Sequence, residues 1–243
     1  MLTDQELLEK LFDTDFKRMR NNLALHFVKP VLDVVLSYYN IQYEGLENIP
    51  ETGPALVIPK HVSWQDTPIP PYAVYKAAHR LSYLIEKGAL PTWMEYLGGL
   101  RVIRQRDVAN FAKKGRWVMP GVVHPSVTIS KEFKKKYNEQ LLGYAAFLLY
   151  RGKIIINWAE GHRYVKEMGK IKPKVIEATV LEQKKSGSIP IVCMGMEFSH
   201  KNVPRSRVYV RIGEPIIVPP DYPVGELTTR IQKNLAELSN IRL

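Results

Sequence analysis

A histidine and an aspartate stand five positions apart in the stretch KHVSWQD, residues 60–66, directly after the apolar run PALVIP. A neutral imidazole titrates near physiological pH, so His61 could act as a general base. A carboxylate beside it, supplied by Asp66, would fix the imidazole tautomer and stabilise the imidazolium that forms. Positions five apart on a helix are separated by about 140°, so these side chains can meet only if the chain turns between them. By itself, a histidine after a strand more often has a purely structural place.

Composition limits the classes of protein to which the chain can belong. Its 243 residues suffice for one well-buried α/β domain or two small ones. With 35 Lys and Arg against 24 Asp and Glu, the net charge of +11 predicts an anionic partner, which could be a nucleic acid, an acidic membrane surface, a phosphorylated metabolite or an acidic protein. A single cysteine, Cys193, excludes a disulfide framework and a cysteine-rich metal site. The acidic start MLTDQELLEK lacks the basic-then-apolar order of a signal peptide.

The first forty residues predict two helices. The first is amphipathic and ends in Lys17, Arg18 and Arg20, whereas residues 23–39 are apolar around nearly the whole helical circumference. This second segment is too short and interrupted for a membrane span of about 20 apolar residues, and Pro30 would kink it. It could pack into a protein core, or the pair could lie on a bilayer with basic residues at the headgroups. We therefore divide the chain into residues 1–40, an amphipathic helical segment that associates with membrane, and a body of residues 41–243.

Short apolar runs and amphipathic stretches alternate through the body. Strands are predicted at 54–59, 153–157, 189–195 and 208–213, and helices at 68–79, 88–96, 138–150, 173–185 and 226–239. The first three strands are apolar on both faces, as in a sheet covered by helices. This order predicts a single α/β domain with a mostly parallel or mixed sheet, preceded by the amphipathic two-helix segment. Residues 105–137, with KKGR and KEFKKK, fit neither template.

Three further blocks follow the histidine in fixed order: GGLRVIR (98–104), WAEGHR (158–163) and IPIVCMG (189–195). With the His-x-x-x-x-Asp block they resemble the PlsC-like glycerolipid acyltransferases, or 1-acylglycerol-3-phosphate acyltransferases. That family has a Gly-rich block ending in Arg, a Phe-Pro-Glu-Gly-Thr-Arg block and an apolar block with a central Pro. Flanking phrases extend the resemblance to about residues 43–220. The chain departs from it at Ala159 and His162, and the long interval between Arg104 and Glu160 indicates an insertion within 105–137.

The resemblance implies roles for residues in each block. His61 would be the base and Asp66 its orienting carboxylate. Glu160 would contact or organise the acceptor, although a buried structural ion pair is the alternative for Glu160 and Arg163. Arginine suits a phosphate because its planar guanidinium donates in a fork. The substrate-binding residues implied by the resemblance are Gly99, Arg104, Glu160, Gly161, Arg163 and Pro190, with Pro190 in the acyl-chain region.

The implied reaction is transfer of a fatty acyl group from acyl-CoA or acyl carrier protein to the free hydroxyl of a lysophospholipid. The first candidate acceptor is 1-acylglycerol 3-phosphate, which would give phosphatidic acid. The resemblance implies no metal and no organic cofactor. It also requires no protein nucleophile: Ser63 lies within the turn, and Cys193 lies within an apolar strand, where a thiol is normally inert. We expect the protein to bind peripherally to anionic lipid on the cytoplasmic face of a membrane.

Other functions remain as alternatives. The acceptor could instead be glycerol 3-phosphate, another lysophospholipid or a lyso-aminolipid, or the chain could be a non-catalytic lipid-binding protein on the same fold. A nucleic-acid binder is disfavoured because no recognition module accompanies the basic runs. A zinc hydrolase is disfavoured because no pair of the six histidines has metal-ligand spacing on a helix.

Overall fold

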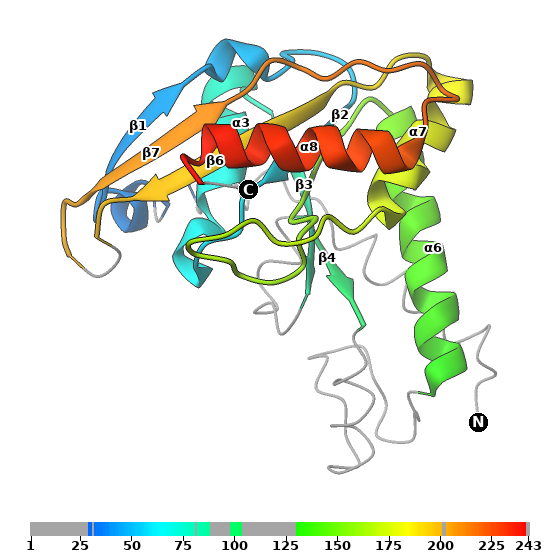
Figure 1. Ribbon diagram of the computed structural model, residues 1–243, viewed down its shortest axis with the longest axis horizontal. Coiled ribbons are helices and arrows are strands. Elements are labelled where there is room, and N and C mark those ends of the chain that lie inside the picture. The colour runs from blue at the N-terminus through cyan, green and yellow to red at the C-terminus, as the bar shows by residue number, and fades with distance from the viewer. Residues whose placement is uncertain are drawn as a thin grey trace.

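The computed structural model describes residues 29–30, 32–80, 82–87, 98–103, 130–200 and 203–241 (Figure 1). These residues form a seven-stranded sheet with the order β1-β7-β6-β2-β5-β3-β4. The strands are β1 (Asn40–Glu44), β2 (Ala55–Pro59), β3 (Ser82–Lys87), β4 (Gly99–Val102), β5 (Ile154–Asn157), β6 (Ile191–Phe198) and β7 (Arg207–Ile212). Strands β6, β2, β5, β3 and β4 run parallel to one another, β7 is antiparallel to β6, and β1 is parallel to β7. The predicted α/β fold with a mostly parallel, mixed sheet is therefore confirmed.

Helices cover both faces of the sheet, because successive residues of each strand point to opposite sides. The helices are α3 (Ile69–Ala78), α6 (Lys131–Tyr150), α7 (Lys174–Ser186) and α8 (Val224–Leu238). On one face, α6, α7 and α8 pack against Leu56 and Ile58 of β2. On the other face, α3 packs against Val57. Figure 1 shows α8, in red, crossing the front of the sheet with α3 behind it. The two cores leave β2 buried along its whole length.

The sheet reverses its direction of winding between β2 and β5, which are hydrogen-bonded neighbours. After β2 the chain passes through α3 to β3, which lies beyond β5, whereas after β5 it passes through α7 to β6, which lies beyond β2. In open α/β sheets, ligands bind at such a switch point, outside the carboxyl ends of the strands. The residues that follow β2 and β5, including His61 and Glu160, therefore meet at the position where this fold places a site.

The four predicted strands are present as β2, β5, β6 and β7, whereas β1, β3 and β4 were not predicted. Strands β1 and β4 are edge strands, and β1 alternates between exposed and half-buried residues, so neither forms a fully apolar run. The predicted helices at 68–79, 173–185 and 226–239 are α3, α7 and α8, with ends that differ by one or two residues. The helix predicted at 88–96 lies outside the described residues.

The helix predicted at 138–150 is wrong at its start, because α6 begins at Lys131. Ser130 caps it by accepting a hydrogen bond from the backbone N–H of Phe133 at 3.0 Å. The buried residues Phe133, Tyr137 and Leu141 continue one face with a spacing of four. The lysines of KEFKKK lie between these positions and obscured the helical pattern of residues 131–137 in the sequence.

Only the end of the segment 1–40 lies within the described residues. Residues 32–36 are helical, and Leu36 and Tyr39 are buried against the face that also contacts α3. Val34 and Val35 on the same short stretch are 72% and 50% exposed. Part of this stretch thus belongs to the core while its other side is open to solvent. None of the described helices is long and apolar enough to cross a membrane.

The closest packing between a helix and the sheet predicts a difference between two glycine substitutions. A Cβ at Gly195 of β6 would overlap the backbone carbonyl of Leu238 at the end of α8, whereas a Cβ at Gly143 of α6 would meet nothing. We expect Gly195→Ala to lower the free energy of unfolding by about 1–3 kcal/mol through overpacking. Gly143→Ala should raise it by about 0.5–1 kcal/mol through helix propensity. Urea unfolding of both variants measures the difference, and equal stabilities would contradict the observed packing of α8.

Candidate active site

His61 and Asp66 meet because the chain turns sharply after β2. The short helix η2 (Trp64–Asp66) brings the aspartate back to the histidine, so that Nδ1 of His61 lies 3.0 Å from Oδ1 and 3.2 Å from Oδ2 of Asp66. The histidine side chain is 12% exposed and the aspartate side chain is fully buried. This is the turn that the five-residue spacing requires, and it places the pair at the switch point of the sheet.

Backbone donors hold the Asp66 carboxylate in place. Its Oδ2 accepts hydrogen bonds from the N–H groups of Val62 at 2.6 Å and Ser63 at 2.7 Å. A carboxylate only accepts hydrogen bonds, so its contact with His61 favours the tautomer whose Nδ1–H donates. The lone pair of Nε2 is then available, and within the described residues Nε2 has no hydrogen-bond partner. An imidazole held in this way is arranged to take a proton from a group that approaches Nε2.

A second carboxylate, Glu160, lies in the loop that follows β5 and receives three donors. Its Oε1 accepts from Nζ of Lys60 at 2.7 Å and from the backbone N–H of Gly169 at 2.8 Å. Its Oε2 accepts from the backbone N–H of His61 at 3.0 Å. The side chains of Lys60 and Glu160 are both completely buried. Both oxygens bind groups of the protein itself, so this position fits a carboxylate that organises the site, whereas the resemblance implied that Glu160 contacts or organises the acceptor.

The lysine that binds Glu160 was given no role by the sequence. Lys60 lies between an apolar strand and the histidine. From the sequence, its side chain could either be buried or reach solvent. Here its Nζ also donates to the carbonyl of Tyr164 at 2.9 Å and lies 5.6 Å from the centre of that ring. A buried ion pair was the alternative for Glu160 and Arg163. The structure has such a pair, but the partner of Glu160 is Lys60, and Arg163 is exposed.

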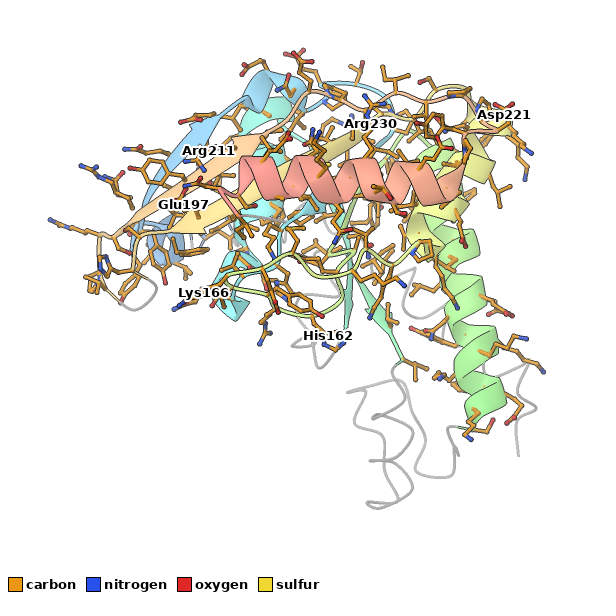
Figure 2. The ribbon with its side chains drawn as sticks, in the orientation of Figure 1. His162, Lys166, Glu197, Arg211, Asp221 and Arg230 are labelled. Carbon is orange, nitrogen blue, oxygen red and sulfur yellow. The ribbon has the colours of Figure 1, made fainter. Side chains whose placement is uncertain are left out.

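The loop after β5 presents cations beside the histidine. Within this loop Gly161 has a φ of +67°, a conformation that favours glycine, and its N–H donates to the carbonyl of Trp158 at 2.9 Å. The exposed cations of this loop are Arg163, Lys166, Lys170 and Lys172, and His162 is exposed among them. Figure 2 shows His162 and Lys166 on the loop below α8. The backbone N–H of Tyr164 donates to the carbonyl of His61 at 2.9 Å, which fixes the loop against the turn after β2.

Trp158, at the start of the same loop, forms an apolar wall for the base. Its ring centre lies 5.7 Å from that of the His61 imidazole, and the indole is 6% exposed. Its N–H has no hydrogen-bond partner among the described residues. A largely buried indole beside the imidazole lowers the access of water to the place where a proton would be transferred.

The remaining predicted substrate-binding residues are not brought to the histidine. Pro190 precedes β6 at the amino ends of the strands, and its carbonyl accepts from the N–H of Leu56 at 3.0 Å. Five residues of extended chain separate that level from His61, roughly 16 Å at 3.3 Å per residue. Gly99 lies in β4, three strands from β2 and therefore about 14 Å away. Arg104 lies outside the described residues.

Neither candidate protein nucleophile is arranged for attack. The hydroxyl of Ser63 donates to Oε1 of Gln65 at 3.1 Å. Cys193 is completely buried in β6, and burial raises the pKa of its thiol to about 12, so the thiolate is not formed near neutral pH. Among the described residues, no three His, Cys, Asp or Glu side chains are grouped so that they could hold a metal ion. The one reactive arrangement in this part of the chain is thus the oriented base.

The chain is similar to a known protein family and to solved structures. Residues 40–197 match the model of a protein family described as Acyltransferase. The structure is similar to the crystal structure of the 1-acyl-sn-glycerophosphate (LPA) acyltransferase PlsC from Thermotoga maritima, with a TM-score of 0.53 and 16% sequence identity. That match covers 98% of this chain and 80% of the other. No match to a curated protein was found.

The geometry of the pair predicts a tautomer change in Asp66→Asn. The two backbone N–H groups at Oδ2 would claim the amide oxygen, which turns the NH₂ group toward Nδ1 of His61. Nδ1 must then accept, so the proton of the neutral imidazole should move from Nδ1 to Nε2. Nitrogen-15 NMR of the histidine side chains measures this directly. The matched control is Asp221→Asn at an exposed position, which should leave the spectrum of His61 unchanged. An Nδ1–H tautomer in Asp66→Asn would contradict the assigned role of Asp66.

Proposed function

The chain belongs to the acyltransferase family, whose model matches residues 40–197, and on that premise we propose that it acylates the free hydroxyl of a lysophospholipid. The donor is a fatty acyl thioester, either acyl-CoA or acyl carrier protein. The observation that carries the proposal is the His61–Asp66 pair at the switch point, with Nε2 open and no nucleophile arranged beside it in the described part of the chain. Such a pair suits a reaction in which the substrate supplies the attacking oxygen.

The steps follow from the position of the imidazole. Nε2 of His61 takes the proton of the acceptor hydroxyl as the oxygen attacks the thioester carbonyl and forms a tetrahedral intermediate. The Asp66 carboxylate stabilises the imidazolium at Nδ1. Collapse of the intermediate breaks the carbon–sulfur bond, the new ester is released, and the thiolate takes the proton from Nε2. The base returns to its neutral form, and neither a metal nor a redox cofactor enters the balance.

The basic loop supports a phosphate-bearing acceptor. Residues 162–172 carry four Arg or Lys side chains and one acid, Glu167, and all five are exposed. The exposed guanidinium of Arg163 is two residues from Gly161 and three from the buried Glu160. It can donate to a phosphate in a bidentate manner. The smallest lysophospholipid that offers both a free hydroxyl and a phosphate monoester is 1-acylglycerol 3-phosphate, with glycerol 3-phosphate or a larger lysolipid as alternatives.

Contact with a membrane is part of the proposal, because a lysophospholipid resides there. Val165, which lies between Arg163 and Lys166, is 52% exposed, so the loop offers an apolar side chain among cations. This combination favours the boundary between acyl chains and anionic headgroups. We place the protein peripherally on the cytoplasmic face, with its loop of residues 162–172 toward the lipid.

An acyl-transfer assay tests the function. Purified protein is incubated with acyl-CoA or acyl carrier protein and with a panel of acceptors, delivered either in anionic vesicles or as short-chain soluble analogues, and the products are identified by mass spectrometry. We expect phosphatidic acid as the main product and faster turnover on vesicles at low salt. His61→Ala should lower the rate about 10²–10⁴-fold because it removes the base. A wild-type protein that binds lysolipid without forming any acyl product would instead be a lipid-binding protein.

Arg163→Lys tests recognition of the phosphate. The lysine keeps the charge but loses the fork of donors, so the variant should bind the phosphate-bearing acceptor more weakly by about 1.5–3 kcal/mol, which is roughly tenfold or more in KM. The KM for the acyl donor should change less. The matched control is Arg151→Lys. Arg151 is exposed and lies between α6 and β5, at the amino ends of the strands. Equal KM values for the acceptor in wild type and Arg163→Lys would exclude this role.

A further inference from the structure

Lys60 is a completely buried cation next to the base, and the reaction described above does not use it. Burial of an ammonium group is costly unless it is paired and hydrogen-bonded. Here Nζ donates to Oε1 of Glu160 and to the carbonyl of Tyr164, and among the described residues Glu160 is its ionic partner. Two of its three protons therefore have partners, and both partners belong to the loop that follows β5.

The same two residues hold the main chain of His61. Oε2 of Glu160 accepts from its N–H at 3.0 Å, and the N–H of Tyr164 donates to its carbonyl at 2.9 Å. Lys60 thus binds the two residues that fix the backbone from which the imidazole projects. Lys60 is also the neighbour of His61 in the chain. The side chain of Lys60 and the backbone of His61 are therefore both hydrogen-bonded to the loop after β5. Loss of the ammonium would leave the carboxylate without its charged partner at the backbone of the base.

Charge balance gives Lys60 a second effect on the imidazole. From its own turn, the imidazole faces the carboxylate of Asp66. The loop after β5 adds the carboxylate of Glu160 at the backbone N–H of His61 and the uncharged indole of Trp158 beside the ring, and its His162 and Arg163 are exposed. The opposite charges of Lys60 and Glu160 lie 2.7 Å apart and largely cancel at the imidazole. Among the described residues, Asp66 is the other buried charge in contact with the imidazole, and it orients the ring.

We propose that Lys60 is a positioning residue, which neutralises Glu160 and holds the main chain of His61, so that Asp66 is the unbalanced carboxylate that orients the base. The inference rests on the proposed acyl transfer and on His61 as its base. It assigns a role to a residue that does not touch the reacting atoms. The role requires a buried cation of lysine length, because Nζ must reach both the carboxylate and the carbonyl of the opposite loop.

Two single substitutions give opposite predictions for the pH dependence of kcat/KM. In Lys60→Met, the unbalanced carboxylate of Glu160 favours the imidazolium, so more alkaline solution is needed to obtain the neutral base. The midpoint of the acid limb should rise by about one pH unit. In Glu160→Gln, the unbalanced ammonium of Lys60 disfavours the imidazolium, and the midpoint should fall. If Lys60 only supported the fold, neither substitution would shift the midpoint of the acid limb, and the two would not shift it in opposite directions.

The kinetic constants supply the second measurement. For Lys60→Met we expect kcat at the pH optimum to fall about 10–100-fold, with the KM of donor and acceptor within threefold of wild type, because the base is displaced while the substrate-binding groups remain. Lys60→Gln keeps a donor for Glu160 without the charge, and it serves if the methionine variant does not fold. Lys135→Met removes the cation of an exposed pair on α6 and should match wild type throughout.

The outcomes separate this inference from the proposed function. The inference would be overturned if folded Lys60→Met or Lys60→Gln had a lower Tm but the wild-type kcat and an unmoved acid limb. The proposed function would survive that result as long as His61→Ala remained inactive. A rise of both KM values at unchanged kcat would overturn the inference too, because Lys60 would then act in binding. A lower kcat with the acid limb unmoved in both charge variants would overturn the charge balance. If His61→Ala kept wild-type activity, the proposed base itself would fail.

Discussion

The ion pair between Lys60 and Glu160 joins the two chain segments from which the site is built. Lys60 follows β2 and Glu160 follows β5, and both side chains are fully shielded from solvent. Removal of one partner from such a pair typically costs about 3–5 kcal/mol, because the other charge stays buried and unpaired. The exposed pair of Lys135 and Glu139, at 4.0 Å, belongs to a class worth about 0–1 kcal/mol. The turn after β2 and the loop after β5 are therefore joined by a buried ion pair.

The order of the strands determines where the turn after β2 and the loop after β5 can meet. Strands β2 and β5 are adjacent, yet their outgoing connections diverge to α3 on one face and α7 on the other, so neither of these two helices covers the carboxyl ends between them. The buried runs of β2 and β5 fix the height at which each strand ends. A turn that ends one strand and a loop that ends the next then face each other across a single strand spacing. His61, Asp66 and Glu160 are close for that reason.

Two carboxylates near one imidazole have different functions because their surroundings differ. Asp66 is held by two backbone N–H groups and turned toward Nδ1, so its charge acts on the ring. Glu160 is held by a lysine and two backbone N–H groups, so its charge is balanced and it acts on the backbone. With the hydroxyl of Ser63 bonded within its turn and Cys193 buried, the proposed reaction uses His61 as its base and takes the nucleophile from the substrate.

The sequence alone determined the class of fold, four of the strands and the pairing of His61 with Asp66. These features depend on local pattern: continuous apolar runs must be buried, and a histidine five residues from an aspartate can pair in one turn. It also identified the block that contains Glu160 and Arg163, through a resemblance carried by residue types in order. The edge strands β1 and β4 were not predicted, because a strand with a neighbour on one side only need not be a fully apolar run. The start of α6 was not predicted, because lysines lie between its buried residues.

Only the tertiary structure decided which charges meet. Lys60 and Glu160 are 100 residues apart in the chain, and nothing in the pattern around either indicates that the lysine side chain turns inward. The winding of the sheet brings them together, and Pro190 lies at the amino ends of the strands although its block follows the others in sequence. Local pattern reports burial and turns, which are short-range properties of the chain. The partner of a buried charge is set by strand order, which depends on how the whole core packs.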